Sequence, residues 1–195
     1  GRIKAPNYGI NTFALTLGLN YGWHEKQEFK TDSLPTPASY AERIKYNIAF
    51  RTGVSEGPVP HLGQRQFYHF GAYADKRIGR KSVLQFGTDL FFSRYLQEYI
   101  RYVSVAFPKG HEAYANSNTD YRRIGLFVGH ELIIDKLAIE TQMGYYVYKP
   151  FDYEIDVYQR LTLKYYVTKS LFMGLGLKTH NERAEAAEAT LGIRL

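Results

Sequence analysis

The chain has 195 residues, a length that suits one domain or one barrel, and it contains no cysteine. A chain without cysteine has neither a disulfide framework nor a thiolate metal site. The formal net charge is +6, but Lys and Arg are scattered along the sequence, which argues against nucleic acid as a partner. No stretch approaches the roughly 18 consecutive apolar residues of a membrane helix, although a membrane β-barrel needs none.

The first predicted element is a strand over residues 11–23, where apolar residues alternate with small or polar ones. One side of this strand holds Phe13, Leu15, Leu17, Leu19, Tyr21 and Trp23. Residues 24–40 are charged and contain proline, which is typical of a linker. We therefore predict three parts: the end of a preceding barrel unit at 1–23, a linker at 24–40, and an antiparallel β-barrel at 41–195.

The period-two pattern then recurs eight times, in runs of roughly 10–13 residues, a length that crosses a bilayer at a tilt. These predicted strands cover residues 42–54, 66–77, 83–94, 121–133, 137–149, 157–168, 171–180 and 185–195. The apolar face of each run is expected to meet lipid. Charged residues share the opposite parity and are expected inside: Lys45, Arg51, Asp89, Arg123, Glu131, Glu140, Arg160, Lys164, Lys178 and Arg194.

The predicted connections alternate between short turns and longer loops, as in outer-membrane barrels. Residues 97–119 form the longest expected external loop. The fold class is thus all-β, an antiparallel transmembrane barrel of about eight strands plus the extra strand at 11–23. Two alternatives stay open: a soluble β-sandwich or lipocalin-like barrel, whose strands also alternate, and one larger barrel of roughly 16 strands.

Candidate chemistry is concentrated in the last predicted hairpin, where His180 and Glu188 share a face. They could form a general base and its orienting carboxylate, or belong to a salt-bridge network that fills the lumen. His130 falls on the lipid-face parity and has no second histidine at metal-binding spacing. The acidic residues of 152–156 lack the glycine and terminal Glu of a calcium loop. The sequence therefore predicts no metal and no cofactor.

The opening stretch GRIKAPNYGINTFALTLGLNYGW resembles the segment after the catalytic His-x-Ser-Asn of outer-membrane lipid A 3-O-deacylases and related acyloxyacyl hydrolases of Bacteroidota. That family motif reads His-x-Ser-Asn-Gly-x-x-Lys-x-Pro-Asn-x-Gly-Ile-Asn. It is matched by Gly1, Lys4, Pro6, Asn7, Gly9, Ile10 and Asn11. The stretches GLFVGHELIID and GLKTHNERAEAAEATLGIRL resemble the second half of longer members. The resemblance covers most of the chain.

The resemblance implies an ester hydrolase that removes a fatty acyl chain from lipid A with a Ser nucleophile, a His base and an orienting acid. The His-x-Ser pair would lie immediately before Gly1, and the acid position falls on Asn11. An asparagine can orient histidine by hydrogen bonding but cannot stabilise imidazolium by charge. The implied location is the bacterial outer membrane, and the implied partner is membrane lipid or lipopolysaccharide.

Whether the chain as given is an enzyme stays open, because it contains no His-x-Ser. The alternative is a non-catalytic outer-membrane barrel with a structural or complex-subunit role, in contact with other outer-membrane proteins. A small channel is a third hypothesis. A lumen packed with opposed charges argues against it, since eight-stranded barrels are usually filled by side chains.

Overall fold

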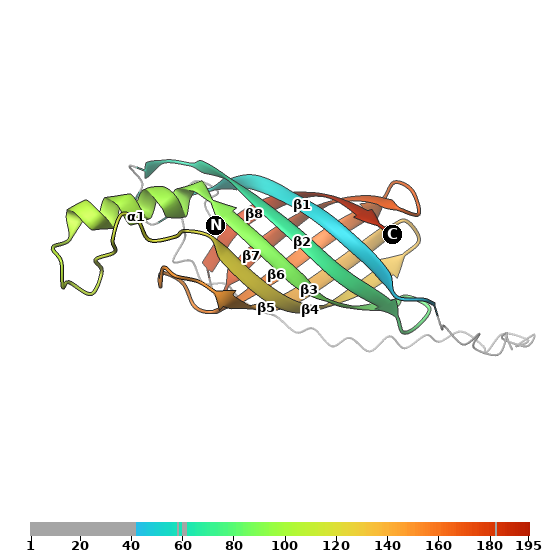
Figure 1. Cartoon of the computed structure of the whole chain (residues 1–195). Coiled ribbons are helices and arrows are strands. Elements are labelled where there is room, and N and C mark those ends of the chain that lie inside the picture. Colours follow the sequence, from blue (N-terminus) through green and yellow to red (C-terminus); the bar gives the residue numbers. More distant parts are fainter. Residues whose placement is uncertain (1–41, 58, 60–61, 182) are drawn as a thin grey trace, which may run out of the picture.

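In the computed structural model, residues 42–57, 59, 62–181 and 183–195 are described, and eight antiparallel strands among them close into a barrel in chain order (Figure 1). The strands are β1 Lys45–Ser55, β2 Arg65–Arg77, β3 Ser82–Ser93, β4 Arg123–Ile134, β5 Leu137–Tyr148, β6 Val157–Tyr166, β7 Leu171–His180 and β8 Arg183–Arg194. Pairing of β1 with β8 completes the ring, which confirms the eight-stranded barrel. The predicted strand at 11–23 and linker at 24–40 lie outside the described residues. None of the helices in the described part is long and apolar enough to cross a membrane.

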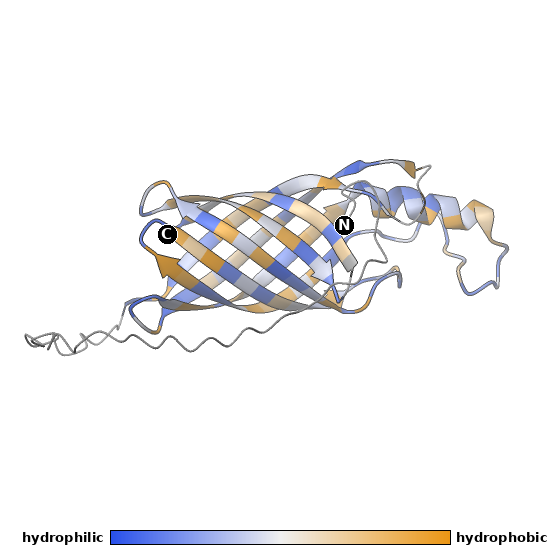
Figure 2. Ribbon diagram, turned by 180° about the vertical axis from the view of Figure 1, so that it is seen from behind, coloured by the Kyte–Doolittle hydropathy of each residue, from blue (hydrophilic) through white to orange (hydrophobic). Residues whose placement is uncertain are grey.

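Hydrophobic and hydrophilic residues alternate along the strands of the barrel (Figure 2). Alternate residues of each strand point outward, so the predicted lipid-face residues are exposed, Leu175 on β7 to 72% and Val128 on β4 to 60%. A soluble sandwich buries this face and presents its polar face to water. The arrangement is reversed here, so the soluble alternative is wrong and the barrel is of the transmembrane type.

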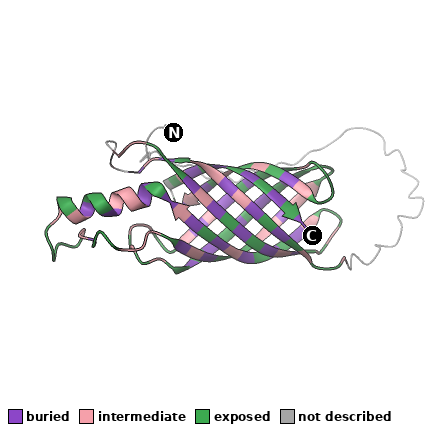
Figure 3. Ribbon diagram, turned by 45° about the horizontal axis from the view of Figure 1, so that its top comes forward, coloured by how far each residue is buried: buried purple, intermediate pink, exposed green. Residues whose placement is uncertain are grey.

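Along the strands, residues of the inward parity are mostly buried (Figure 3). Nine of the ten charged residues predicted on this parity are buried, whereas Lys45, near one end of the barrel, is half exposed. The interior also holds large aromatic side chains that the sequence analysis did not place there: Tyr73, Phe91, Phe127, Tyr146, Tyr158 and Phe172. The lumen is therefore filled by rings and charges together.

Interior glycines make room for these rings. A Cβ on Gly125 would lie 2.6 Å from Cε1 of Tyr158, and a Cβ on Gly144 would collide with the same ring. Tyr158 is completely buried between these glycines and Phe91, whose ring centroid is 5.1 Å away. The glycines on the polar parity are thus explained by the packing of the lumen.

The segment after β3 differs from the prediction of an open loop at 97–119. Residues Arg94–Ala106 form the helix α1, which extends the barrel wall outward (Figure 1). Its buried side chains recur at helical spacing: Tyr95, Leu96, Ile100 and Val103. The prediction failed because the interleaved charged and polar residues were taken as a sign of a solvated loop.

The two ends of the barrel differ. The loop end carries α1 and the β1–β2, β3–β4, β5–β6 and β7–β8 connections, and the turn end carries the three short turns and the C-terminus (Figure 1). The β7–β8 connection is shorter than the predicted loop at 181–184, because β7 ends at His180 and β8 begins at Arg183. Asn181 adopts φ 50°, a left-handed conformation that asparagine tolerates in tight turns.

Candidate functional site

The first candidate site is a cluster of charged residues at the loop end of the lumen. This mouth cluster consists of Arg123, Tyr146, Glu154, Lys178, His180 and Glu185. All lie on strands except Glu154, which reaches into the lumen from the β5–β6 loop. The cluster therefore ties this loop to the barrel wall.

Two carboxylates are held by two cations within the mouth cluster. Arg123 donates through Nη1 to Glu154 and through Nη2 to Glu185 Oε1, at 2.7 Å for the second bond. Lys178 donates to Glu185 and to the Tyr146 hydroxyl, which is 2.7 Å from Nζ. The Arg123 guanidinium also lies 4.9 Å from the centroid of the Tyr146 ring. The aromatic face supplies further attraction for a cation removed from water.

His180 lies between the two carboxylates. Its Nε2 is 3.4 Å from Glu154 Oε2 and its Nδ1 is 3.4 Å from Glu185 Oε2. The Tyr146 hydroxyl is 2.9 Å from Nε2, so the stronger hydrogen bond of the ring is with tyrosine. The imidazole is thus held through Nε2 by tyrosine, with Nδ1 close to the Glu185 carboxylate.

The β5–β6 loop has its own electrostatic balance. Burial raises the pKa of the Glu154 carboxyl, and the neighbouring Glu185 charge adds to this effect, although Arg123 opposes it. Burial disfavours the charge on Lys149, but Asp152 and Asp156, each 2.8 Å from Nζ, outweigh burial and raise its pKa. Lys149 is thereby held as a cation beside the loop.

The mouth cluster also contains the one described group of three metal-ligating side chains. Ligand atoms of Glu154, His180 and Glu185 lie within 4.8 Å of one another. However, Arg123 and Lys178 already donate to both carboxylates, so a divalent ion would meet two resident cations. The donor set therefore fits an ion-pair cluster better than a metal centre.

A second group lies deeper in the lumen and is centred on Arg160. Its guanidinium donates to Asp89 Oδ2 at 2.8 Å, to Glu188 Oε2 at 2.7 Å and to Gln142 Oε1 at 2.7 Å. Asp89 also accepts from Arg51 at 3.0 Å, and Glu188 lies 2.8 Å from Nδ1 of His69. We call these residues the central network. Arg51, His69, Asp89, Arg160 and Glu188 are all buried.

Further ion pairs close the turn end of the lumen. Lys164 donates to Glu131 and Glu140, at 2.9 Å in both cases. Its Nζ also lies 4.2 Å from the centroid of the Phe172 ring. Arg194 pairs with Asp75 at 2.7 Å. Charges of opposite sign are thus matched from one end of the barrel to the other, as the burial of charged side chains requires.

His180 and Glu188, which the sequence analysis singled out as a pair, both lie in the lumen, but the structure does not bring them together. His180 belongs to the mouth cluster, whereas Glu188 pairs with His69 and Arg160 in the central network. The sequence analysis did not identify the pairing of His69 with Glu188, because strands β2 and β8 do not neighbour each other in the ring. Asn11, the predicted acid position, lies outside the described residues.

The described lumen is better suited to structure than to ester hydrolysis. A general base must come within about 3 Å of the proton that it removes, and the lumenal His69 and His180 are 5% exposed or less. No hydrogen bond in the described part joins a serine hydroxyl to a histidine ring. His130, on the exterior parity near the turn end, is half-buried, and its ring makes no hydrogen bond to the described residues of the lumen. The catalytic roles assigned to His180 and Glu188 stay predictions.

Comparison with known proteins identifies the family of the barrel. Residues 44–195 match a family described as "Acyloxyacyl hydrolase, C-terminal domain". The chain belongs to this family. The match begins one residue before β1 and covers the whole barrel, so the acyloxyacyl hydrolase C-terminal domain and the barrel are the same unit.

No curated protein matches the chain. Among solved structures, the chain is similar to Neisserial surface protein A (NspA), with 12% sequence identity and a TM-score of 0.39. That similarity covers 78% of this chain and 94% of the other. The fold of this chain is established by its own strand pairing.

Proposed function

We propose that the protein is an outer-membrane acyl hydrolase that cleaves a fatty acyl ester of lipid A. In this proposal residues 44–195 form the membrane-embedded barrel of the enzyme. The observation that carries the proposal is the match of this barrel to the acyloxyacyl hydrolase C-terminal domain. The apolar exterior supports it, because an enzyme held among lipids meets lipid substrates at the barrel surface.

The nucleophile is expected outside the described residues. Because residues 1–11 resemble the family motif, we expect the His-x-Ser pair upstream of Gly1 and the acid position at Asn11. Ester hydrolysis needs a serine activated by a histidine whose orientation is fixed by a third group. The barrel contributes a rigid support and a place in the bilayer, which keeps the reacting groups at the level of the lipid headgroups and acyl chains.

The proposal is tested with the full protein purified in detergent and mixed with lipid A, with released fatty acid measured by mass spectrometry. Release of one fatty acid species supports hydrolysis, and no release from a folded protein contradicts it. Asn11→Ala should lower kcat/KM at least about tenfold if Asn11 orients the histidine, whereas Asn11→Asp should keep activity or raise it. His130→Gln, on the exterior parity, is the matched histidine control.

The same assay decides the roles predicted for the lumenal residues. If His180→Gln or Glu188→Gln abolishes kcat while the barrel stays folded, a catalytic role is supported. If kcat per folded molecule is retained and only stability falls, the residue is structural. The burial of both side chains favours the second result.

A second candidate function is a non-catalytic barrel with a structural role in the envelope. The observation that favours it is the sealed lumen, whose histidines contact carboxylates and tyrosine but no serine within the described part. A protein that leaves lipid A intact, and whose deletion weakens the outer membrane, would have this role. A channel function is disfavoured, because buried charges and aromatic rings fill the lumen along its length.

A further inference from the structure

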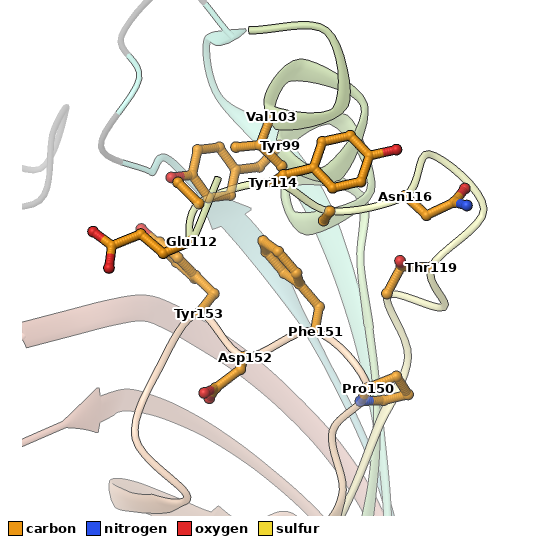
Figure 4. A pocket seen from close by; sticks show the side chains of 12 residues that line it. Tyr99, Val103, Glu112, Tyr114, Asn116, Thr119, Pro150, Phe151, Asp152 and Tyr153 are labelled. Carbon is orange, nitrogen blue, oxygen red and sulfur yellow. The ribbon is translucent and has the colours of Figure 1, made fainter. Parts of the chain in front are cut away.

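A pocket lies outside the lumen at the loop end, between α1, the segment 112–119 and the β5–β6 loop (Figure 4). Its volume is about 510 Å³, within the range of about 300–1,000 Å³ that small-molecule sites occupy. The pocket is separate from the ion-pair clusters of the lumen and from the apolar face that meets lipid. Its position on the loop end makes it accessible from one side of the membrane.

One side of the pocket is a continuous aromatic wall of Tyr99, Phe151 and Tyr153 (Figure 4). The ring centroids of Tyr99 and Tyr153 are 4.8 Å apart, those of Tyr99 and Phe151 are 5.9 Å apart, and those of Phe151 and Tyr153 are 6.0 Å apart. All three side chains are half-buried. Each ring therefore packs against the protein on part of its surface, and all three line the pocket.

The spacing of the rings excludes a cage for a quaternary ammonium ion. Centroids 4.5–7 Å apart mark rings in direct contact, which leaves no space for a cation between them. Tyr114, from the segment after α1, faces the wall from another side of the pocket (Figure 4). The geometry suits a flat ligand that lies on a wall of rings.

Polar groups at the rim complement the aromatic wall. Asn116 and Thr119 lie on one side of the opening and Glu112 lies on the other (Figure 4). Asn116 Oδ1 accepts from the backbone N–H of Asn118 at 3.0 Å, and its Nδ2 donates to no described residue. The charged lining residues are Glu112 and Asp152, and Asp152 is paired with Lys149 at 2.8 Å. Glu112 therefore leaves the lining net acidic, which disfavours phosphate and carboxylate groups.

We propose that this pocket binds a neutral pyranose ring of a glycan. The C–H face of a pyranose is apolar and carries slight positive charge, which matches the negative face of an aromatic ring. Its hydroxyls donate to carboxylates and accept from an amide, which matches Glu112 and Asn116. The proposal does not rest on acyl hydrolysis. A glycan attached to a membrane lipid and a free saccharide share this chemistry.

The test is a ligand-observed NMR titration of the full protein in lipid nanodiscs. The probes are the methyl glycosides of glucose, galactose and N-acetylglucosamine, with glucose 6-phosphate as the anionic comparison. At least one neutral glycoside should bind saturably and more tightly than the phosphate. Phe151→Ala should weaken binding about 2- to 12-fold, the loss expected for one aromatic contact. Ile155→Ala, in the same loop but not lining the pocket, should bind as the wild type does.

Three results would overturn the proposal: no saturable binding of any neutral glycoside, equal binding to the Phe151→Ala variant, or tighter binding of tetramethylammonium than of every glycoside. A second titration uses vesicles that carry a glycolipid with the preferred sugar. Tighter binding to these vesicles than to the free glycoside identifies a lipid-borne glycan, and equal binding identifies a soluble one. Hydrolysis is measured on lipid A without further sugars, so failure of the enzyme assay leaves this test unaffected.

Discussion

Replacement of Arg160 by leucine is expected to destabilise the barrel severely. Arg160 bonds both Asp89 at 2.8 Å and Glu188 at 2.7 Å, and its side chain is inaccessible to solvent. After replacement, Asp89 keeps Arg51 and Tyr158, but Glu188 keeps only His69 as a hydrogen-bond partner among the described residues. Removal of one partner from a buried ion pair leaves an uncompensated charge and costs about 3–5 kcal/mol.

The assay is reversible urea unfolding of the protein in lipid vesicles, followed by the strand signal in circular dichroism. Arg160→Leu should lower the free energy of unfolding by about 3–5 kcal/mol. The double variant Arg160→Leu/Glu188→Leu should lose less than the sum of the two single losses, because it removes both charges together. Arg101→Leu, in an exposed pair with Glu98, should change the free energy by less than about 1 kcal/mol. A single loss below about 1 kcal/mol for Arg160→Leu, or strict additivity, would refute a paired lumen.

Three further predictions concern packing, pH and lipid contact. Gly125→Ala should cost about 1–3 kcal/mol, because its Cβ would meet an interior tyrosine ring at 2.6 Å, whereas Gly79→Ala, with 3.8 Å of clearance, should be nearly neutral in the same unfolding assay. The raised pKa of Glu154 means that the folded state binds its proton more tightly than the unfolded state does, so its contribution to stability falls as pH rises above the ordinary value of 4.5. The unfolding free energy of Glu154→Gln relative to wild type should therefore drop between pH 7 and pH 5, and a flat difference would contradict this sign. Leu175→Lys, on the outer face within β7, should lower the free energy of unfolding in vesicles by about 2–4 kcal/mol. Leu195→Lys, at the strand end, should lower it by at most about 1 kcal/mol. Equal losses would show that the bilayer does not cover this face.

The strands were predictable because alternate residues of a membrane-barrel strand face lipid and lumen, and therefore alternate between apolar and polar. Leu175 and Leu177 face outward, and Lys178 and His180 face inward, as the parity requires. Parity alone assigns a face but does not identify contacts across the lumen. Asp89 and Arg160 are 71 positions apart, and their pairing depends on the stagger of the strands from β3 to β6 around the ring.

The alternation of apolar and polar residues did not predict the interior aromatic side chains or the helix α1. An aromatic side chain such as Phe91 or Tyr158 fits lipid and lumen equally well. Only the residues that share its face of the strand indicate that it points into the interior. The helix α1 has a period of 3.6, but its charged exposed face resembles a solvated loop when the sequence is read for strands. The half-buried rings of the outer pocket come from α1 and the β5–β6 loop, and only the fold brings these segments together.

The central claim, that this barrel belongs to an enzyme acting on lipid A, is tested most directly by the mass spectrum of lipid A from cells. Cells that make the full protein are compared with cells that lack it, and the folded barrel is verified in the outer-membrane fraction. The account predicts a lipid A species lighter by one ester-linked acyl chain, present only with the protein and absent when its serine nucleophile is replaced by alanine. Unchanged lipid A in cells whose outer membrane contains the folded protein would contradict the account.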